Sequence, residues 1–221
     1  MIRITLPDGS EKKARPGACV CDIAGQIDRL LGEAPICASV NGELRSMYDQ
    51  LTEDCQVTFH TSATRQGRMV LHHTAAHLIA QAVKRLFPAA VLGTGHPTEN
   101  GFYHDVEIGR PFSSEELRQI EAESTRIIDE DLPIVRCKMS KEGARTLLIR
   151  RGDILRLELL AALPDATLSL YRQGEYVEFC RGPHLVSTGK MPQLRIHGLE
   201  AVSWLDDPHA EHLNRIHGMI A

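Results

Sequence analysis

The sequence predicts an α+β fold in two regions joined by a short linker. Strand-like segments flank one amphipathic helix before residue 62, a small, polar and basic stretch follows at 63–68, and helical segments alternate with strand-like ones after it. Apolar residues that alternate indicate half-buried strands, and apolar residues three or four apart indicate helices, so both regions mix the two kinds of element. We therefore expect domains at residues 1–62 and 69–221.

The first region has the order of elements of a β-grasp, the ubiquitin-like plan. Apolar side chains alternate over residues 2–6, and the turn-forming Pro7-Asp-Gly-Ser10 lets residues 10–14 return as the second strand of a hairpin. The remaining elements are expected as a helix at 21–31 and strands at 36–42 and 55–61. Two strands, a helix and further strands within one short region are typical of this plan.

The second region predicts an antiparallel sheet packed by helices. Its first helix, about 68–87, ends at Pro88, and the helix at 113–131 opens with the capping box Ser113-x-x-Glu116. The other elements are expected as a turn-rich loop running into a strand at 95–108, a strand at 134–140, a helix between Ser140 and Gly152, a hairpin over 167–184 that turns at Gln173-Gly174, and the start of a helix at 210–221.

Composition narrows the class of protein. A formal net charge of −4 argues against binding to nucleic acid by bulk charge, although Lys84-Arg85 and Arg150-Arg151 are candidates for a local basic groove or, more commonly, solvated surface. The six cysteines show no disulfide spacing, and no apolar run has the roughly 20 residues of a membrane span. We expect a soluble, cytoplasmic protein with reduced thiols and no membrane partner; its oligomeric state is not predicted.

The residues that indicate chemistry are His73, His77, Cys180 and His184. His73 and His77 are four apart on the first helix of the second region, so both imidazoles project from one face, and Cys180 and His184 follow the hairpin. Each pair alone is more often packing than chemistry. Together they form the nitrogen and sulfur donor set that tetrahedral Zn²⁺ prefers, or a metal-free site in which one histidine acts as a general base. Both interpretations predict hydrolysis of a bound substrate.

The motifs also resemble a known family. The HxxxH helix, "ENGFYHD" at 99–105 and "EYVEFCRGPH" at 175–184, preceded by "LPDGS" and "VNGEL", resemble the N-terminal half of bacterial threonyl-tRNA synthetases. There the first module is called TGS, and the second is an editing domain shared with alanyl-tRNA synthetases. The resemblance implies proofreading, in which serine is hydrolysed from threonine tRNA at the terminal adenosine. Such a step is needed because one missing methyl group changes discrimination by only about 1–3 kcal/mol.

The resemblance implies a catalytic set of His73, His77, Cys180 and His184, with His73 as the first choice of base. It also implies substrate-binding roles for a second set of residues: Gly95, Tyr103, His104, Arg156, Glu178 and Arg181. Three of these depart from the family pattern, which has Tyr at 104, Lys at 156 and Asp at 178. Arginine is a poor proton acceptor, so Arg156 is expected to hold a carboxylate or phosphate instead.

The resemblance leaves the cofactor open, with either no metal required or Zn²⁺ held by His73, His77, Cys180 and His184. The expected partner is the acceptor end of tRNA(Thr) carrying serine. The ATP site and aminoacylation activity of the synthetases are not expected in this chain, which matches either an editing part of a longer enzyme or a free-standing editing factor. The alternative is a non-catalytic tRNA-binding or regulatory module with a degenerate editing site.

Overall fold

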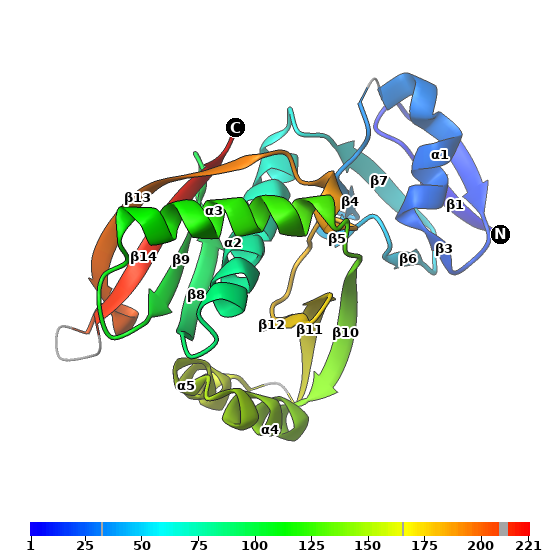
Figure 1. Ribbon diagram of the computed structural model, residues 1–221. Helices are drawn as coiled ribbons and strands as arrows, with labels where there is room; N and C mark the ends of the chain where they lie inside the picture. Colours follow the sequence, from blue (N-terminus) through cyan, green and yellow to red (C-terminus); the bar gives the residue numbers. More distant parts are fainter. Residues whose placement is uncertain (32, 165, 208–211) are drawn as a thin grey trace. The chain divides into compact units, whose positions relative to one another are not determined.

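A computed structural model describes residues 1–31, 33–164, 166–207 and 212–221 (Figure 1). The chain divides into two compact units. The first contains Met1–Leu71 and Gly182–Val186, and the second contains His72–Arg181 and Ser187–Ala221.

The first unit is the predicted β-grasp. Its main sheet has the strand order β2-β1-β7-β4-β5, in which β1 and β7 run parallel and the other neighbours antiparallel. Val20 and Ile23 of the helix pack into one core with Ile4 and Val57 of the sheet. The elements are β1 Ile2–Thr5, β2 Glu11–Ala14, β3 Ala18–Cys19, α1 Val20–Leu31, β4 Cys37–Val40, β5 Glu43–Ser46, β6 Gln50–Leu51 and β7 Cys55–His60, with β3 and β6 paired separately.

The second unit contains two antiparallel sheets, of order β13-β14-β9-β8 and β10-β11-β12. The elements are α2 Arg65–Leu86, which belongs to this unit from His72 onward, β8 Val91–Pro97, β9 Phe102–Glu107, α3 Ser114–Asp129, β10 Ile134–Ser140, α4 Lys141–Arg151, α5 Ile154–Ala162, β11 Thr167–Gln173, β12 Tyr176–Phe179, β13 Leu194–Ser203 and β14 His212–Ile220, with short 3₁₀ turns at Thr188–Lys190 and Trp204–Asp206. This is the α+β architecture that the sequence predicts.

Helix α2 is the central element of the second unit. Its apolar residues from Ala75 to Val83 are fully buried, as expected for a helix that is apolar on most of its surface. The polar residues on it are therefore buried as well. His77 and Gln81 are 4% and 1% exposed, so each needs partners inside the fold.

The sheet β10-β11-β12 has two chemically different faces. Leu168 and Phe179 project from one face into an apolar cluster with Ala144, Leu148 and Leu160 of helices α4 and α5. Residues of the hairpin that alternate with these, such as Gln173, project from the other face, where Gln173 Nε2 donates to the carbonyl of His77 at 3.4 Å. The second face therefore presents its side chains to α2.

Several local predictions are confirmed. The side chain of Ser113 accepts from the amide of Glu116 and Glu116 bonds the Ser113 backbone, so the capping box at α3 is complete. Helix α4 runs between the cap residues Ser140 and Gly152, and Gly152 has the left-handed conformation that glycine favours. The hairpin β11–β12 pairs Gln173 with Tyr176.

Three expectations differ from the structure. Helix α2 begins at Arg65, so residues 65–68 are helical instead of linker, and residues 95–97 belong to strand β8 instead of a loop. The predicted C-terminal helix is wrong. Residues 212–220 form strand β14, in which Asn214, Ile216 and Gly218 are buried alternately between β13 and β9; residues 210 and 211 of that expectation lie outside the described residues.

The candidate basic pair Lys84-Arg85 is engaged within the fold. Arg85 forms ion pairs with Glu123, Glu130 and Glu175, which join α2, α3 and the β11–β12 turn. This arginine therefore has a structural role. Within the described residues, no helix has the length and apolar character to cross a membrane.

Candidate functional site

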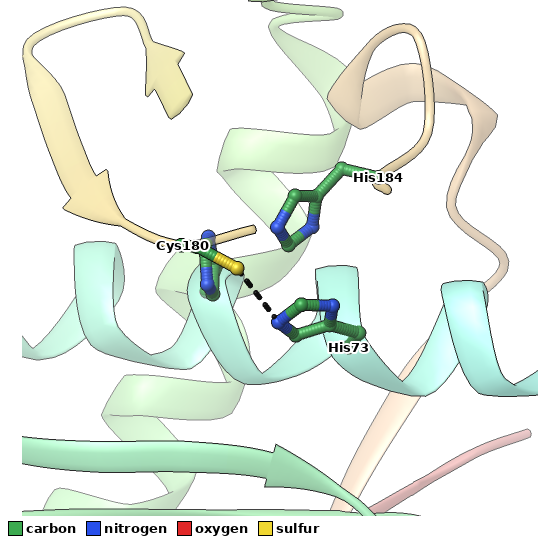
Figure 2. Close-up of side chains that lie close together, drawn as sticks. His73, Cys180 and His184 are labelled. Atoms are coloured by element: carbon green, nitrogen blue, oxygen red, sulfur yellow. Dashed lines mark hydrogen bonds between the residues drawn. The ribbon is translucent and has the colours of Figure 1, made fainter. Parts of the chain in front are cut away.

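Four side chains meet at one place: His73, His77, Cys180 and His184. One nitrogen of each histidine and the Cys180 sulfur all lie within 4.8 Å of one another. Figure 2 shows one pair of the cluster, in which Cys180 Sγ lies 3.1 Å from His73 Nε2. His77 and His184 are buried, whereas His73 and Cys180 remain partly exposed, so the cluster opens to solvent on the side of the thiol–imidazole pair.

Helix α2 positions the two histidines. Residues four apart on a helix share a face, and the rings of His73 and His77 lie edge to face with centroids 5.2 Å apart. The ring of Tyr176 on β12 packs edge-on against His77 at 6.4 Å. These contacts hold the imidazoles at defined angles.

A polar row on α2 holds the hairpin that carries Cys180. Gln81 and Arg85 continue the spacing of His73 and His77 along the same face of the helix. Gln173 Nε2 donates to Gln81 Oε1 at 2.7 Å, and Gln81 Nε2 and Arg85 both bond Glu175 of the turn. The role of Gln81 was not predicted from the sequence, and Gln173 was expected only as a turn residue. The four-residue spacing of polar residues in an apolar helix was a usable signal for Gln81.

The backbone hydrogen bonds between β11 and β12 continue as far as Cys180. The amide of Cys180 donates to the carbonyl of Ser169 at 3.3 Å, one residue beyond the end of β12. Cys180 therefore keeps the strand geometry and projects from the same face as Tyr176 and Glu178.

The donor set fits a zinc ion. Three imidazole nitrogens and one thiolate sulfur are preferred zinc ligands, and tetrahedral bonds of about 2.0–2.3 Å place ligand atoms roughly 3.3–3.8 Å apart. The donor atoms here are within 4.8 Å of one another, so small side-chain rotations bring them to that spacing. The same contacts also fit a metal-free site. In such a site the His73 imidazole is the general base for a water, and the Cys180 thiol forms a hydrogen bond with that imidazole.

Arg156 and Glu178 form a buried ion pair beside the cluster. Arg156 Nη2 lies 2.5 Å from Glu178 Oε2, and the two side chains are 7% and 9% exposed. The Tyr176 hydroxyl donates to the same carboxylate, and Arg156 Nε donates to the Gly93 carbonyl at 3.3 Å. Burial raises the pKa of Glu178, and the Arg156 guanidinium opposes that rise. The carboxylate that Arg156 holds in the structure is thus that of Glu178.

His104 and Gly95 form a second buried contact next to α2. His104 is fully buried, its Nδ1 lies 3.0 Å from the Asp105 carbonyl oxygen, and its Nε2 has no hydrogen-bond partner among the described residues. Burial, and to a smaller extent the charge of Arg156, lowers the pKa of His104 to about 3. A Cβ at Gly95 would lie 2.5 Å from His104 Cδ2 and 3.2 Å from Ala76 Cβ, so the close packing requires glycine.

Tyr103 and Arg181 lie outside these contacts. Tyr103 precedes His104 on β9 and projects from the opposite face of the sheet, where the Arg215 guanidinium lies 4.1 Å from its ring centroid. Arg181 follows Cys180 and is exposed. The structure therefore brings Arg156 to Glu178 and Gly95 to His104, and it separates Tyr103 from His104.

Comparisons with known proteins agree with both regions. A TGS domain model matches residues 2–61, and a model of the threonyl and alanyl tRNA synthetase second additional domain matches residues 168–203, which include Cys180 and His184. The chain is 37% identical over 219 residues to a threonine–tRNA ligase of Symbiobacterium thermophilum, 39% to that of Bacillus velezensis and 38% to threonine–tRNA ligase 1 of Bacillus subtilis. Each alignment covers 99% of this chain and 34% of the relative, so the chain spans about a third of their length. The chain thus contains a TGS domain and a region that matches the second additional domain, and it is similar over nearly its whole length to the N-terminal part of bacterial threonine–tRNA ligases.

Proposed function

We propose that this chain is an aminoacyl-tRNA deacylase that hydrolyses the ester of serine wrongly attached to threonine tRNA, in the cytoplasm. The observation that carries the proposal is the cluster of His73, His77, Cys180 and His184, with its donor atoms within 4.8 Å of one another. The second additional domain and the similarity to threonine–tRNA ligases support tRNA as the partner and editing as the activity. The choice of serine follows from the inability of a threonine pocket to reject the smaller amino acid strongly.

The reaction is an ester hydrolysis. A water oxygen attacks the acyl carbon and gives up a proton to a base, the bond from that carbon to the ribose oxygen of the terminal adenosine breaks, and the base returns the proton to the ribose oxygen. We assign His73 as the base that accepts the proton of the attacking water, because it is partly exposed. The Cys180 thiol, 3.1 Å from His73 Nε2, orients this imidazole, and His77 and His184 complete the polar wall of the pocket.

Zinc remains a proposal alongside the metal-free site. His73, His77, Cys180 and His184 would hold the ion, and a bound Zn²⁺ with one open position lowers the pKa of its water to about 7. Four protein ligands would fill a tetrahedral shell, so a catalytic ion requires that one of the four gives way to water.

The test measures deacylation of Ser-tRNA(Thr), Thr-tRNA(Thr) and Ala-tRNA by the unaltered chain and by His73→Ala, each with and without a chelator. His72→Gln is the matched control, since His72 lies on the same helix and bonds the Thr98 carbonyl outside the cluster. We expect rapid loss of the seryl ester alone, abolished in His73→Ala and kept in His72→Gln.

The assays with chelator distinguish a zinc-dependent site from a metal-free site. Loss of both bound metal and hydrolysis after chelation identifies a zinc-dependent deacylase, whereas unchanged hydrolysis identifies the metal-free base. If micromolar protein binds tRNA(Thr) and leaves all three esters intact, the enzyme proposal is wrong and the chain is a tRNA-binding module.

A further inference from the structure

We propose that Arg136 and Lys138 on strand β10 bind the sugar–phosphate backbone of the tRNA acceptor end, next to the His73–Cys180 pair. The inference rests on the proposed function and names residues that none of the motifs identifies. It follows from the register of the sheet β10-β11-β12 and from the exposure of these two cations.

Sheet register places both cations on the face of the cysteine. Lys138 pairs with Ser169, and the Ser169 carbonyl accepts the amide of Cys180, so the three residues form one row across the sheet. Directly paired residues project from the same face, and neighbouring strands are about 4.8 Å apart. The backbone of Lys138 therefore lies about 10 Å from that of Cys180. At that distance the Lys138 side chain can contact a substrate that occupies the cluster.

The backbone of Arg136 lies in the neighbouring row of the same face, and its side chain extends to the row of Lys138, Ser169 and Cys180. Arg136 pairs with Tyr171, which pairs with Glu178. Arg136 Nη2 donates to Ser169 Oγ at 3.1 Å, which brings the guanidinium to the row of Lys138 and Cys180. The two positive charges thus lie side by side on the edge strand, on the approach to the thiol.

Burial separates these cations from the rest of the face. Tyr171 on the central strand β11 and Glu178 on β12 are buried, whereas Arg136 and Lys138 are exposed on the edge strand β10. The buried residues thus serve the fold, and the exposed cations are accessible to a ligand that also enters the cluster.

Charge identifies the ligand. The substrate ester is the end of a single strand with one phosphate for each nucleotide, and the chain as a whole carries a formal charge of −4. Local cations are therefore needed to hold that strand, and Arg and Lys are the residues that contact phosphates. Residues 136 and 138 are about 6.8 Å apart along an extended strand, which suits contacts to neighbouring phosphates.

The first experiment measures binding without hydrolysis. The full chain binds tRNA(Thr) that carries serine through a non-hydrolysable amide, and Kd is measured over a range of salt concentrations for Arg136→Gln, Lys138→Gln and the double variant. Arg172→Gln is the control, because Arg172 is an exposed arginine on β11 whose partners Val135 and Val177 mark the opposite face. We expect Kd to rise several-fold for each single variant and on the order of tenfold for the double variant at low salt, with no change for Arg172→Gln. The slope of log K against log salt should fall in magnitude by about 0.7 for each side chain removed.

The second experiment uses the serine ester of adenosine, which lacks the preceding phosphates. Both single variants should hydrolyse this small ester at the rate of the unaltered chain while losing activity on Ser-tRNA(Thr). The inference is overturned if the variants keep the original Kd and salt slope, if the unaltered chain does not bind the amide-linked tRNA, or if small-ester hydrolysis falls in parallel. Failure of the proposed function is a different result, in which the unaltered chain hydrolyses neither ester although the binding differences persist.

Discussion

The buried pair of Arg156 and Glu178 predicts a large and specific coupling in stability. The desolvation free energy of an unpaired charge in an apolar interior is larger than the interaction free energy of its remaining contacts. Removal of either partner should therefore destabilise the second unit. We consider Arg156→Met and Glu178→Met, which keep side-chain volume and remove the charge, and the double variant with both changes. The two side chains are 7% and 9% exposed, so water can do little to solvate the remaining charge.

Each single variant is expected to lower the free energy of unfolding by about 3–5 kcal/mol. The double variant leaves no lone charge, although the Tyr176 hydroxyl and the Gly93 carbonyl lose these partners at a cost of about 1–3 kcal/mol each. The cost of the double variant should therefore be well below the sum of the two single costs. Urea unfolding at pH 7.5, followed by circular dichroism, measures all four proteins in one cycle.

Single costs that are each below about 1 kcal/mol, or single costs that simply add in the double variant, would contradict a buried charge pair that couples these two residues. The same proteins also test the substrate-binding roles that the sequence predicts for this pair. If the folded double variant still deacylates Ser-tRNA(Thr) at the original rate, then the pair supports the fold, whereas selective loss of that activity shows that the pair contacts the substrate.

Three further predictions concern single positions. Burial lowers the pKa of His104 to about 3 in the folded chain, whereas an unfolded histidine has a pKa of about 6.5. As the pH falls, the unfolded chain therefore binds a proton at His104 before the folded chain does. The free energy of unfolding should decrease between pH 6.5 and pH 3, by about 2 kcal/mol at pH 5. Urea unfolding at pH 7 and pH 5 should show a smaller loss in His104→Phe, and equal losses would contradict this account. Gly95→Ala places a Cβ 2.5 Å from His104 Cδ2 and should cost about 1–3 kcal/mol in the same assay, while an unchanged midpoint would show that the contact relaxes freely. Ser113→Ala removes the acceptor for the Glu116 amide at the start of α3 and should cost about 1 kcal/mol, whereas Ser113→Asp should restore most of it; no difference between the two would rule out the cap as the cause.

Local signals in the sequence predicted the elements that depend on neighbouring residues. The capping box at Ser113, the cap residues of α4 and the tight turn after Gln173 each act within a few positions, so their outcome follows from the residues themselves. The HxxxH spacing on α2 and the motif at Cys180 likewise predicted the members of the cluster, and the structure brings them together.

Long-range partners were not predictable in the same way. Strand β14 is a strand because β13 and β9 pair with both of its edges, and β9 is more than a hundred residues away in the chain. Arg156 and Glu178 are 22 positions apart with no periodicity that links them, so their ion pair is apparent only when α5 and β12 are folded. In both cases the deciding interaction is tertiary, and it overrides or adds to the local pattern.

The polar row of α2 explains how the cluster can be held before any ligand binds. At one end of the row, Arg85 and Gln81 are tied to Glu175 and Gln173 by hydrogen bonds that fix the hairpin against the helix. At the other end, His73 and the Cys180 thiol meet with part of their surface open. The hydrogen bonds of Gln81 and Arg85 satisfy the polar groups at their end of the row, and they fix the hairpin that places Cys180 beside His73. A preorganised reaction site requires such an arrangement.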